Sequence, residues 1–512
     1  MGGRWDGLSQ SEAADPSILP VVIRAGLVVI ALALVLVGCD GNKKKSAVAA
    51  KPKGPPPPTQ QFRSRPDLKP PPVKVLTANS SEPGYVFLAP KMKVVQAGPM
   101  IVDNRGRLVW FHPLDTHGVA DFKMQRYHGK PVLTWWRGRA PTGVGSGYYA
   151  VYDDTYREIA RVHAGHGYAG DIHEFIITPR NTALFTVYHQ LHVDLSPVGG
   201  PKEGRIFDSI VQEVEIPSGR VLFEWHSWPE VGLKESYAPP PKASKGKKAA
   251  PDDYFHVNSI ELEPNGNLLV SGRNTHALYE IDRKTGKVLW RLGGKRSDFK
   301  MGPGTAFAWQ HDARRQPDGT ITIFDNGAAP PVEKFSRVLV LRVDTSSKKA
   351  TLVRSYRHPK RLLVPFEGNA QFLPNGHVFV GWGAIPYYSE FDASGRLVLD
   401  AHFGKGIARI TGANQDADSY RAYRFVWHGH PTNRPAVAVD GGRLSVSWNG
   451  ATEVARWRVL AGSDADHLRR VKDVAKTGFE TSIPVSSAAY SAAQALARDG
   501  SVLGTSRTEK GG

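Results

Sequence analysis

The sequence repeats one unit several times, and the unit is clearest at residues 254–290. Two strand-like runs at 256–263 and 268–273 flank a Pro-Asn-Gly turn at 264–266, and two more at 277–282 and 288–290 flank a Lys-Thr-Gly-Lys turn. Four short antiparallel strands joined by tight turns are typical of one β-propeller blade. The first hairpin also brings its two ends together, so we expect His256 and Arg273 to lie side by side at one rim.

Related units recur along the chain at spacings of roughly 40–55 residues, within the range of propeller blades. Turns of the Pro-Asn-Gly or Pro-Asp-Gly type hold equivalent places at 264–266, 317–319 and 374–376. The 52 Gly and 38 Pro residues also favour a turn-rich all-β protein. We predict a propeller of six or seven four-stranded blades over residues 73–463. The seventh set is indicated at 425–430, 443–448 and 454–459, and residues 464–512 either finish the last blade or pack below the disc.

The N-terminal region carries the only cysteine, Cys39, which excludes an intrachain disulfide. An apolar run at 25–37 precedes it, and a run of about 13 residues is short for a membrane span but suits a signal peptide. Residues 1–39 resemble a lipoprotein signal ending in a lipobox, which implies export and a lipid anchor on Cys39 at the outer side of the cytoplasmic membrane or the periplasmic face. An uncleaved anchor or a chance cysteine is the alternative interpretation.

Positive charge is concentrated in segments of low complexity. The formal net charge is +18, and lysines crowd at 43–45 and in the insert 239–253. We interpret these runs as solvated linkers, because no arginine-rich helix or base-stacking motif accompanies them, and we predict no nucleic-acid partner. Residues 40–72, rich in Pro and Lys, are predicted to form a disordered tether, and 239–253 a disordered insert.

The candidate site lies where the first strands of the blades converge on a central channel. His173, His256 and His311 open strands at the same place in three repeats, and Arg273 ends the strand that returns from His256. Three imidazoles can bind zinc, but an adjacent fixed cation repels a metal and prefers a sulfate or phosphate, so we predict no metal. Further side chains expected around a substrate at this mouth are Trp309, Asn326, Asn369, Trp382 and His428.

This pattern resembles the arylsulfotransferase family, exported bacterial propeller enzymes that move a sulfuryl group between phenols without a nucleotide donor. The likeness spans residues 73–460. It is closer to a divergent branch of the family than to the well-studied periplasmic members, and the paired cysteines of those members are missing from this sequence. It implies that His311, in Trp-Gln-His-Asp, is the nucleophile that forms a sulfohistidine. It further implies that His173, His256 and Arg273 surround the sulfuryl group, that an aryl sulfate and a phenol are the substrates, and that no cofactor is needed.

Two other classes of protein compete with this interpretation. Residues 280–290 resemble the tryptophan docking repeat of quinoprotein dehydrogenases, but the repeat is well formed only once and the acidic calcium site of those enzymes is not evident. A non-catalytic surface propeller that binds a ligand or protein is the second alternative, and it would tolerate loss of His311. Nucleophile-elbow, P-loop and HExxH motifs are absent from the sequence, which removes the common hydrolase and kinase interpretations.

Overall fold

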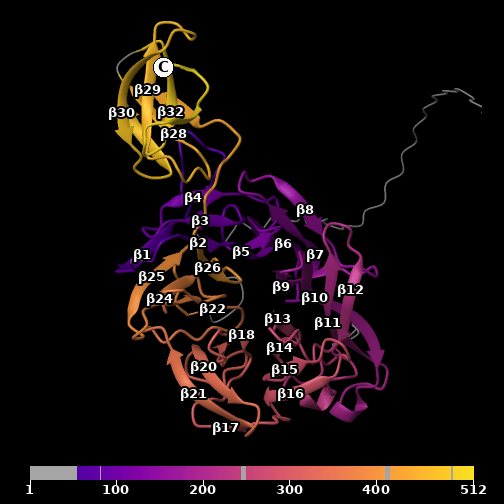
Figure 1. The fold of residues 1–512 in the computed structure, drawn as a ribbon. Coiled ribbons are helices and arrows are strands. Elements are labelled where there is room, and N and C mark those ends of the chain that lie inside the picture. Colours follow the sequence, from indigo (N-terminus) through magenta and orange to yellow (C-terminus); the bar gives the residue numbers. More distant parts are fainter. Residues whose placement is uncertain (1–54, 81, 244–248, 410–414, 486–487, 512) are drawn as a thin grey trace, which may run out of the picture. The chain divides into compact units, whose positions relative to one another are not determined.

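The computed structural model describes residues 55–80, 82–243, 249–409, 415–485 and 488–511. In this described part the chain is almost entirely β, with two 3-10 turns, η1 (Ser196–Val198) and η2 (Leu233–Glu235), and no α-helix. Its strands build six four-stranded blades around a central channel (Figure 1). The predicted all-β propeller is therefore confirmed. The predicted lipobox and Cys39 lie outside the described residues.

Blades 1 to 3 come from the first half of the ring, and each is given from its innermost strand outward. Blade 1 consists of β26 (Ala422–Phe425), β2 (Tyr85–Leu88), β3 (Met100–Val102) and β4 (Leu108–Phe111). Blade 2 consists of β5 (Val119–Tyr127), β6 (Lys130–Arg139), β7 (Ser146–Tyr152) and β8 (Glu158–Val162). Blade 3 consists of β9 (Gly170–Ile177), β10 (Thr182–Val193), β11 (Gly204–Glu215) and β12 (Val221–His226).

Blades 4 to 6 complete the ring. Blade 4 consists of β13 (Val257–Leu262), β14 (Leu268–Gly272), β15 (Ala277–Ile281) and β16 (Val288–Gly293). Blade 5 consists of β18 (His311–Arg315), β19 (Ile321–Asp325), β20 (Arg337–Asp344) and β21 (Lys349–Tyr356), with β17 (Lys300–Met301) parallel to β21. Blade 6 consists of β22 (Asn369–Phe372), β23 (Val378–Gly381), β24 (Tyr387–Phe391) and β25 (Leu397–Phe403), and β1 (Val73–Ala78) pairs with β25 as a fifth strand.

The blades are held together by apolar side chains that fill the spaces between neighbouring sheets. Leu269 and Trp290 of blade 4, for example, share one buried cluster with Ile323 and Leu341 of blade 5. Alternate residues of a strand point to opposite faces, and here both faces are covered by another blade. This explains why the central strands β14, β15, β19 and β24 are buried along their whole length.

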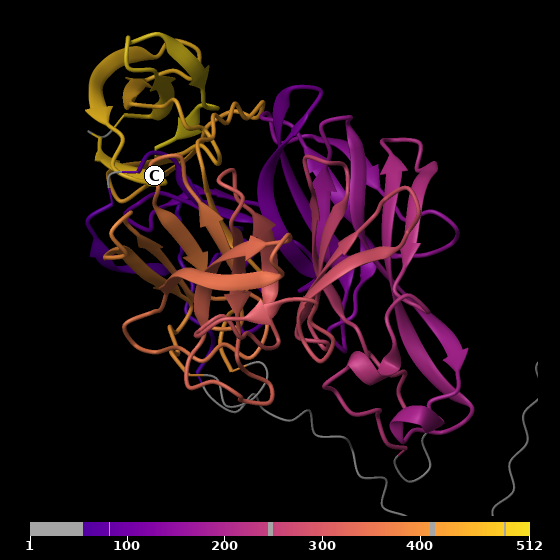
Figure 2. The same cartoon turned by 60° about the horizontal axis from the view of Figure 1, so that its bottom comes forward.

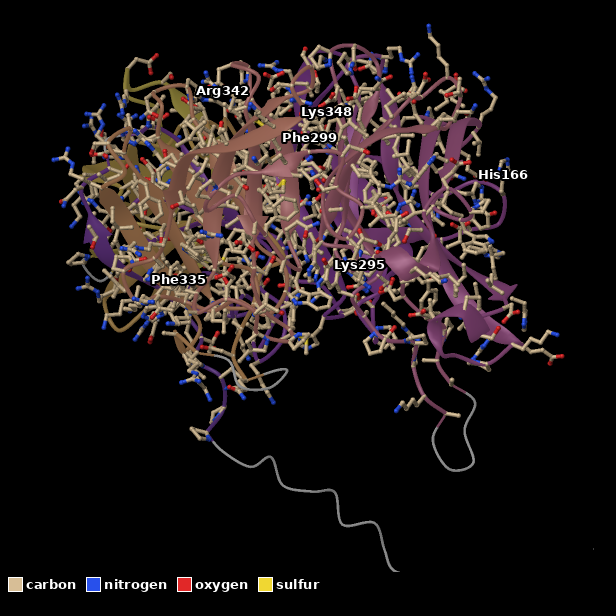
Figure 3. The ribbon with its side chains drawn as sticks, turned by 90° about the horizontal axis from the view of Figure 1, so that it is seen from below. His166, Lys295, Phe299, Phe335, Arg342 and Lys348 are labelled. Atoms are coloured by element: carbon tan, nitrogen blue, oxygen red, sulfur yellow. The ribbon has the colours of Figure 1, made fainter. Side chains whose placement is uncertain are left out.

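Blades 3 and 5 carry additions besides the fifth strand of blade 6. In blade 3, β10 and β11 pair over their whole length, whereas β9 reaches only as far as Val187, so the two strands run on as a long hairpin (Figure 2). In blade 5, the ammonium group of Lys348 lies 5.0 Å from the ring centre of Phe299, next to β17 (Figure 3). A cation over an aromatic face stabilises such an edge modestly.

The ring is closed by strands from distant parts of the chain. β26 pairs antiparallel with β2 in the register Leu88↔Ala422 to Tyr85↔Phe425, so blade 1 combines one late strand with three early ones. The predicted seventh set of strands does not form a blade. Residue 425 ends the inner strand of blade 1, and 443–447 and 456–462 lie in other sheets, because a sixth blade already closes the circle.

Residues after 435 form two further sheets. One contains β27 (Ala436–Asp440), β28 (Arg443–Ser447) and β31 (Glu480–Pro484). The other contains β29 (Arg456–Gly462), β30 (Arg469–Ala475), β32 (Tyr490–Leu496), β33 (Val502–Thr505) and β34 (Glu509–Lys510). A cluster that includes the fully buried Trp457 packs between them. The expected boundary at 463 and the expected completion of the last blade by 464–512 are thus not what the structure has, since this C-terminal module has its own core.

Described parts of the expected tether and of the expected insert make ordered contacts with the fold. Leu68 is fully buried, the ring centres of Phe62 and Phe479 are 4.5 Å apart, and the Ser64 N–H donates to Glu480 at 2.6 Å. Residues 59–72 therefore pack against the fold instead of continuing the tether. The insert is anchored at its C-terminal end, where the Phe207 N–H donates to the Asp252 carbonyl at 2.9 Å.

Candidate active site

The inner strands of blades 3, 4 and 5 bring the three predicted histidines to one end of the channel. His173 lies in β9, His256 directly precedes β13, and His311 opens β18. The ring centres of His173 and His256 are 4.7 Å apart at an interplanar angle of 82°. Tyr420 joins the third imidazole to them, because its ring centre is 5.7 Å from that of His173 and 6.5 Å from that of His311. We call His173, His256, His311 and Arg273 the histidine cluster.

Each imidazole is oriented by a partner on its Nδ1 atom. Asp171 contacts Nδ1 of His173 at 2.5 Å, and Asp253 contacts Nδ1 of His256 at 2.5 Å. A carboxylate accepts the Nδ1 proton, so the Nε2 atoms of both rings are free to exchange a proton with a ligand. Burial lowers the pKa of His256, and the charges of His173 and Arg273 lower it further against the opposing effect of Asp253.

The protonation of His311 follows from its neighbour Asn326. The amide NH₂ of Asn326 donates to the carbonyls of Val364 at 3.2 Å and Glu367 at 2.9 Å, so its oxygen faces His311. That oxygen lies 2.7 Å from Nδ1 of His311, which must therefore carry the proton. The lone pair is then on Nε2, where it accepts the Glu367 N–H at 3.2 Å.

His311 is neutral at physiological pH. Burial lowers its pKa well below the ordinary value, and the nearby cation of Arg273 lowers it further. The side chain is almost completely buried, at 2 % exposure. A neutral imidazole with a defined lone pair is the nucleophilic form of histidine.

Arg273 supplies a fixed positive charge, which the nearby carboxylate of Asp253 stabilises without forming an ion pair. Its N–H donates to the His256 carbonyl at 2.9 Å, so the expected hairpin does place the two residues together. The guanidinium lies 4.9 Å from the ring centre of Trp309 and donates to Asn274 Oδ1 at 2.8 Å. Burial lowers its pKa to about 10, which leaves it charged at neutral pH. Among the described residues no carboxylate forms an ion pair with it, which suits an anionic ligand.

A row of packed aromatic rings connects Arg273 with the exposed Tyr237. Trp309 meets His276 edge to face with ring centres 4.3 Å apart, and His276 stacks on Tyr237 at 4.1 Å. The ammonium group of Lys295, labelled in Figure 3, lies 4.8 Å from the ring centre of Tyr237. Burial, together with the charges of Arg273 and Lys295, lowers the pKa of His276 to about 4, so this ring is neutral at pH 7.

The sequence did not indicate a second group beside His311, the buried set Glu367, Lys91 and Asp418. Lys91 Nζ lies 2.8 Å from Glu367 Oε1 and 2.7 Å from Asp418 Oδ2, while Glu367 Oε2 is buried without a hydrogen-bond partner. Burial raises the pKa of Glu367 to about 7. The sequence signal for this place was Gly368 directly before a strand, since glycine there indicates a close approach of the backbone. In the structure, Glu367 and Gly368 both have positive φ, and a Cβ on Gly368 would lie 2.5 Å from the Phe324 ring.

Three of the residues predicted to contact substrate lie elsewhere. The Asn369 amide is used on both sides by the backbone of Ala422, at 2.9 Å each, and so fastens blade 6 to blade 1. Trp382 is fully buried in its blade and donates to Ser389 at 3.0 Å. His428 follows β26 at the end remote from Ala422, has a side chain that is 67 % exposed, and contacts Glu453 at 2.8 Å. Trp309 and Asn326, by contrast, lie at the histidine cluster.

Below the histidine cluster the channel is filled by buried charges. Arg421, completely buried, contacts Glu174 and Asp121 at 3.0 Å each. Arg314 contacts the other oxygen of Glu174 at 2.5 Å, and Lys123 contacts the first at 2.9 Å. Seven residues from the inner strands of blades 2 to 5 and from the segment before β26 form what we call the ion network: Asp121, Lys123, Glu174, Glu261, Asp312, Arg314 and Arg421.

No group of three or more His, Cys, Asp or Glu side chains in the described residues is arranged to hold a metal ion. No helix in the described ranges has the length and apolar character needed to cross a bilayer.

The comparison with protein families decides the membership of the chain. The profile of the arylsulfotransferase (ASST) family matches residues 123–404, more than half of the chain. The chain belongs to the arylsulfotransferase family. The matched region of this arylsulfotransferase-family protein contains His173, His256, Arg273 and His311, whereas blade 1 lies outside it.

Other comparisons are more distant. No curated protein matches the chain. A protein of unknown function from Bacteroides caccae is 13% identical, covers 64% of this chain and 98% of its own, and has a TM-score of 0.37. A catalytically inactive variant of virginiamycin B lyase from Staphylococcus aureus is 9% identical, with 74% and 97% covered and a TM-score of 0.34. The periplasmic gluconolactonase of Pseudomonas aeruginosa is 12% identical, with 79% and 99% covered and a TM-score of 0.33. Similarities at this level do not bear on the activity of this chain.

Proposed function

We propose that this protein transfers a sulfuryl group from an aryl sulfate to a phenol through a covalent intermediate on His311. The observation that carries the proposal is the pairing of a neutral, correctly oriented imidazole with a buried guanidinium that lacks a carboxylate. The first is a nucleophile and the second a binding site for an oxyanion, and both belong to one cluster.

The reaction has two displacements at sulfur. In the first, the lone pair of His311 Nε2 attacks sulfur, the bond between sulfur and the aryl oxygen breaks, and the aryl group leaves as a phenolate, which is protonated by the proton that the second displacement releases. In the second, the oxygen of the incoming phenol attacks sulfur, its proton passes to a base, and the bond between sulfur and Nε2 breaks. His311 is then neutral again, and no other reactant is consumed.

The remaining members of the cluster have roles in both displacements. Arg273 is placed to stabilise the charge on the sulfuryl oxygens. His256 and His173 are suited to carry the proton, because each ring is held by a carboxylate on Nδ1 and has a free Nε2. The Glu367 N–H now donates to the lone pair of His311 and must turn to a sulfuryl oxygen when the bond to sulfur forms.

The test is transfer from 4-nitrophenyl sulfate to phenol by the purified full-length chain. We expect release of 4-nitrophenol together with phenyl sulfate, without a nucleotide and without sensitivity to EDTA. With the donor alone, the intact mass of the protein should rise by that of one SO₃ group. A chain that releases no 4-nitrophenol over a panel of phenol acceptors would refute the proposal.

Glu367 should give the transfer a pH dependence on the alkaline side. Its carboxyl group is uncharged below a pKa of about 7 and charged above it, where it adds a negative charge beside the site that must bind an anionic sulfate ester. We expect the KM for 4-nitrophenyl sulfate to rise by roughly three- to tenfold between pH 6 and pH 8. The measurement is KM against pH for the parent and for Glu367→Gln.

The glutamine variant keeps the size of the side chain and the backbone N–H but cannot ionise. Its KM should be flat over the same interval, while the kcat of the parent and variant should agree near pH 6. If KM rises equally in both proteins, the alkaline dependence comes from a different group. Glu203→Gln, which makes the same chemical change on an exposed residue directly before β11, is the matched control.

A further inference from the structure

A pocket outside the channel adjoins the histidine cluster. This pocket of about 550 Å³ lies between the loop that joins β6 to β7 and the long hairpin of β10 and β11. Tyr188 and Phe207 contact each other edge to face, with ring centres 6.1 Å apart at 81°, and form one aromatic wall of the pocket. The hairpin that carries both rings is visible in Figure 2 as the extension of blade 3. An open pocket of this volume beside an aromatic wall has room for one substituted aromatic ring.

The pocket shares two residues with the surroundings of the reactive imidazoles. The Tyr188 ring centre lies 5.7 Å from that of His173 and 5.9 Å from that of His256, and its hydroxyl group donates to the Val257 carbonyl at 2.7 Å. On the other side, the Gly145 N–H donates at 2.5 Å to Asp171, the carboxylate that holds His173. A Cβ on Gly145 would approach Asp171 to 3.0 Å and the Ile172 backbone nitrogen to 2.6 Å, so the loop can come this close only with glycine.

The lining of the pocket contains a cationic side chain but no acidic one. Arg139 contributes a guanidinium, Thr142 and Ser146 contribute hydroxyl groups, and Gln190 contributes an amide, whereas none of the lining residues is Asp or Glu. Arg139 ends β6 at the rim, is exposed, and forms no ion pair with any carboxylate in the described residues. A ring that points its reacting oxygen at the histidine cluster would therefore present its far end to a cation and to hydrogen-bond donors.

We propose that this pocket holds the aryl group of the substrate and selects phenols and aryl sulfates that carry a second acidic group, such as a carboxylate, on the ring. The proposal rests on the sulfuryl transfer proposed above and adds its substrate class. Arg139 is then a specificity-determining residue, because it meets the substituent and not the sulfuryl group.

The experiment compares 4-hydroxybenzoate with its methyl ester, which has the same ring but no charge. With 4-nitrophenyl sulfate as donor, we expect kcat/KM for the acid to exceed that for the ester by about fivefold to tenfold at low salt. In Arg139→Gln this preference should vanish, through loss of activity towards the acid alone. Arg105→Gln, which alters an exposed arginine in the turn between β3 and β4, should keep the preference.

Binding of the two compounds, measured by calorimetry in the absence of donor, separates failure of this inference from failure of the proposed function. If transfer fails but the acid binds more tightly than the ester, and only when Arg139 is present, the pocket assignment stands without the reaction. Equal kcat/KM values for acid and ester in the parent, or a preference that survives Arg139→Gln, would overturn the assignment even if transfer is rapid.

Discussion

Replacing His311 with asparagine should lower the rate of sulfuryl transfer by at least about four orders of magnitude, because the attacking lone pair is removed. Asparagine is smaller than histidine and can still bond to the Asn326 side chain, so the fold should persist. The adduct of one SO₃ group, formed with 4-nitrophenyl sulfate alone, should also disappear. Rate and intact mass are both to be measured, since only a covalent role for His311 predicts the loss of both.

His428→Asn is the matched control for this substitution. It makes the same chemical change on an exposed histidine at the far end of blade 1, and we expect parental rates. An unfolding midpoint close to that of the parent would show that His311→Asn acts on chemistry alone. A His311→Asn protein that still forms the adduct would place the nucleophile on a different side chain, while one that transfers without an adduct would favour direct attack by the phenol.

Replacing Arg421 with methionine should destabilise the propeller by about 3–5 kcal/mol, because carboxylates of the ion network then lose a buried cation. Arg421 bonds to Glu174 through two nitrogens and also reaches Asp121, and all three side chains are at most 2 % exposed. Methionine fills much of the same space without charge, so the loss is mainly electrostatic. The measurement is the midpoint and slope of unfolding in guanidinium chloride.

A second substitution tests whether unbalanced charge is the cause. In the double variant Arg421→Met with Glu174→Gln, one negative charge is removed together with the cation, and part of the lost stability should return. Arg396→Met, which removes an arginine that is 82 % exposed, should change stability by less than about 1 kcal/mol. If the double variant is less stable than the sum of its single changes, packing and not charge balance explains the effect.

Much of the ring could be predicted from the sequence because blades repeat a local pattern. The strands and turn of the 254–290 unit form as expected, and the equivalent positions of His173, His256 and His311 place them together through symmetry alone. Asn369 also opens a strand, but its amide turns sideways to the backbone of Ala422. Position in a repeat predicts where the backbone lies, and it does not predict which neighbour a side chain prefers.

The rest depends on contacts between residues far apart in the sequence. Lys91 meets Glu367 and Asp418 only because blade 1 is built from both ends of the ring, so no local pattern could indicate this group. The strands after residue 435 alternate as blade strands do, and only their pairing shows that they belong to separate sheets. Residues 59–72 have the composition of a tether, yet a few apolar side chains such as Leu68 suffice to dock them.

The closure of blade 1 by β26 has a consequence for when the protein becomes competent during its synthesis. Tyr420 and Arg421, which contact the histidine cluster and the ion network, immediately precede β26 and leave the ribosome after all three histidines. Until then β2 lacks its inner partner, and the carboxylates of the ion network lack Arg421, one of the three cations that neutralise them. A nascent or truncated chain that stops before residue 425 therefore carries every residue of the proposed chemistry but not the geometry. Ring closure thus makes translation of β26 the step that completes the geometry of the site.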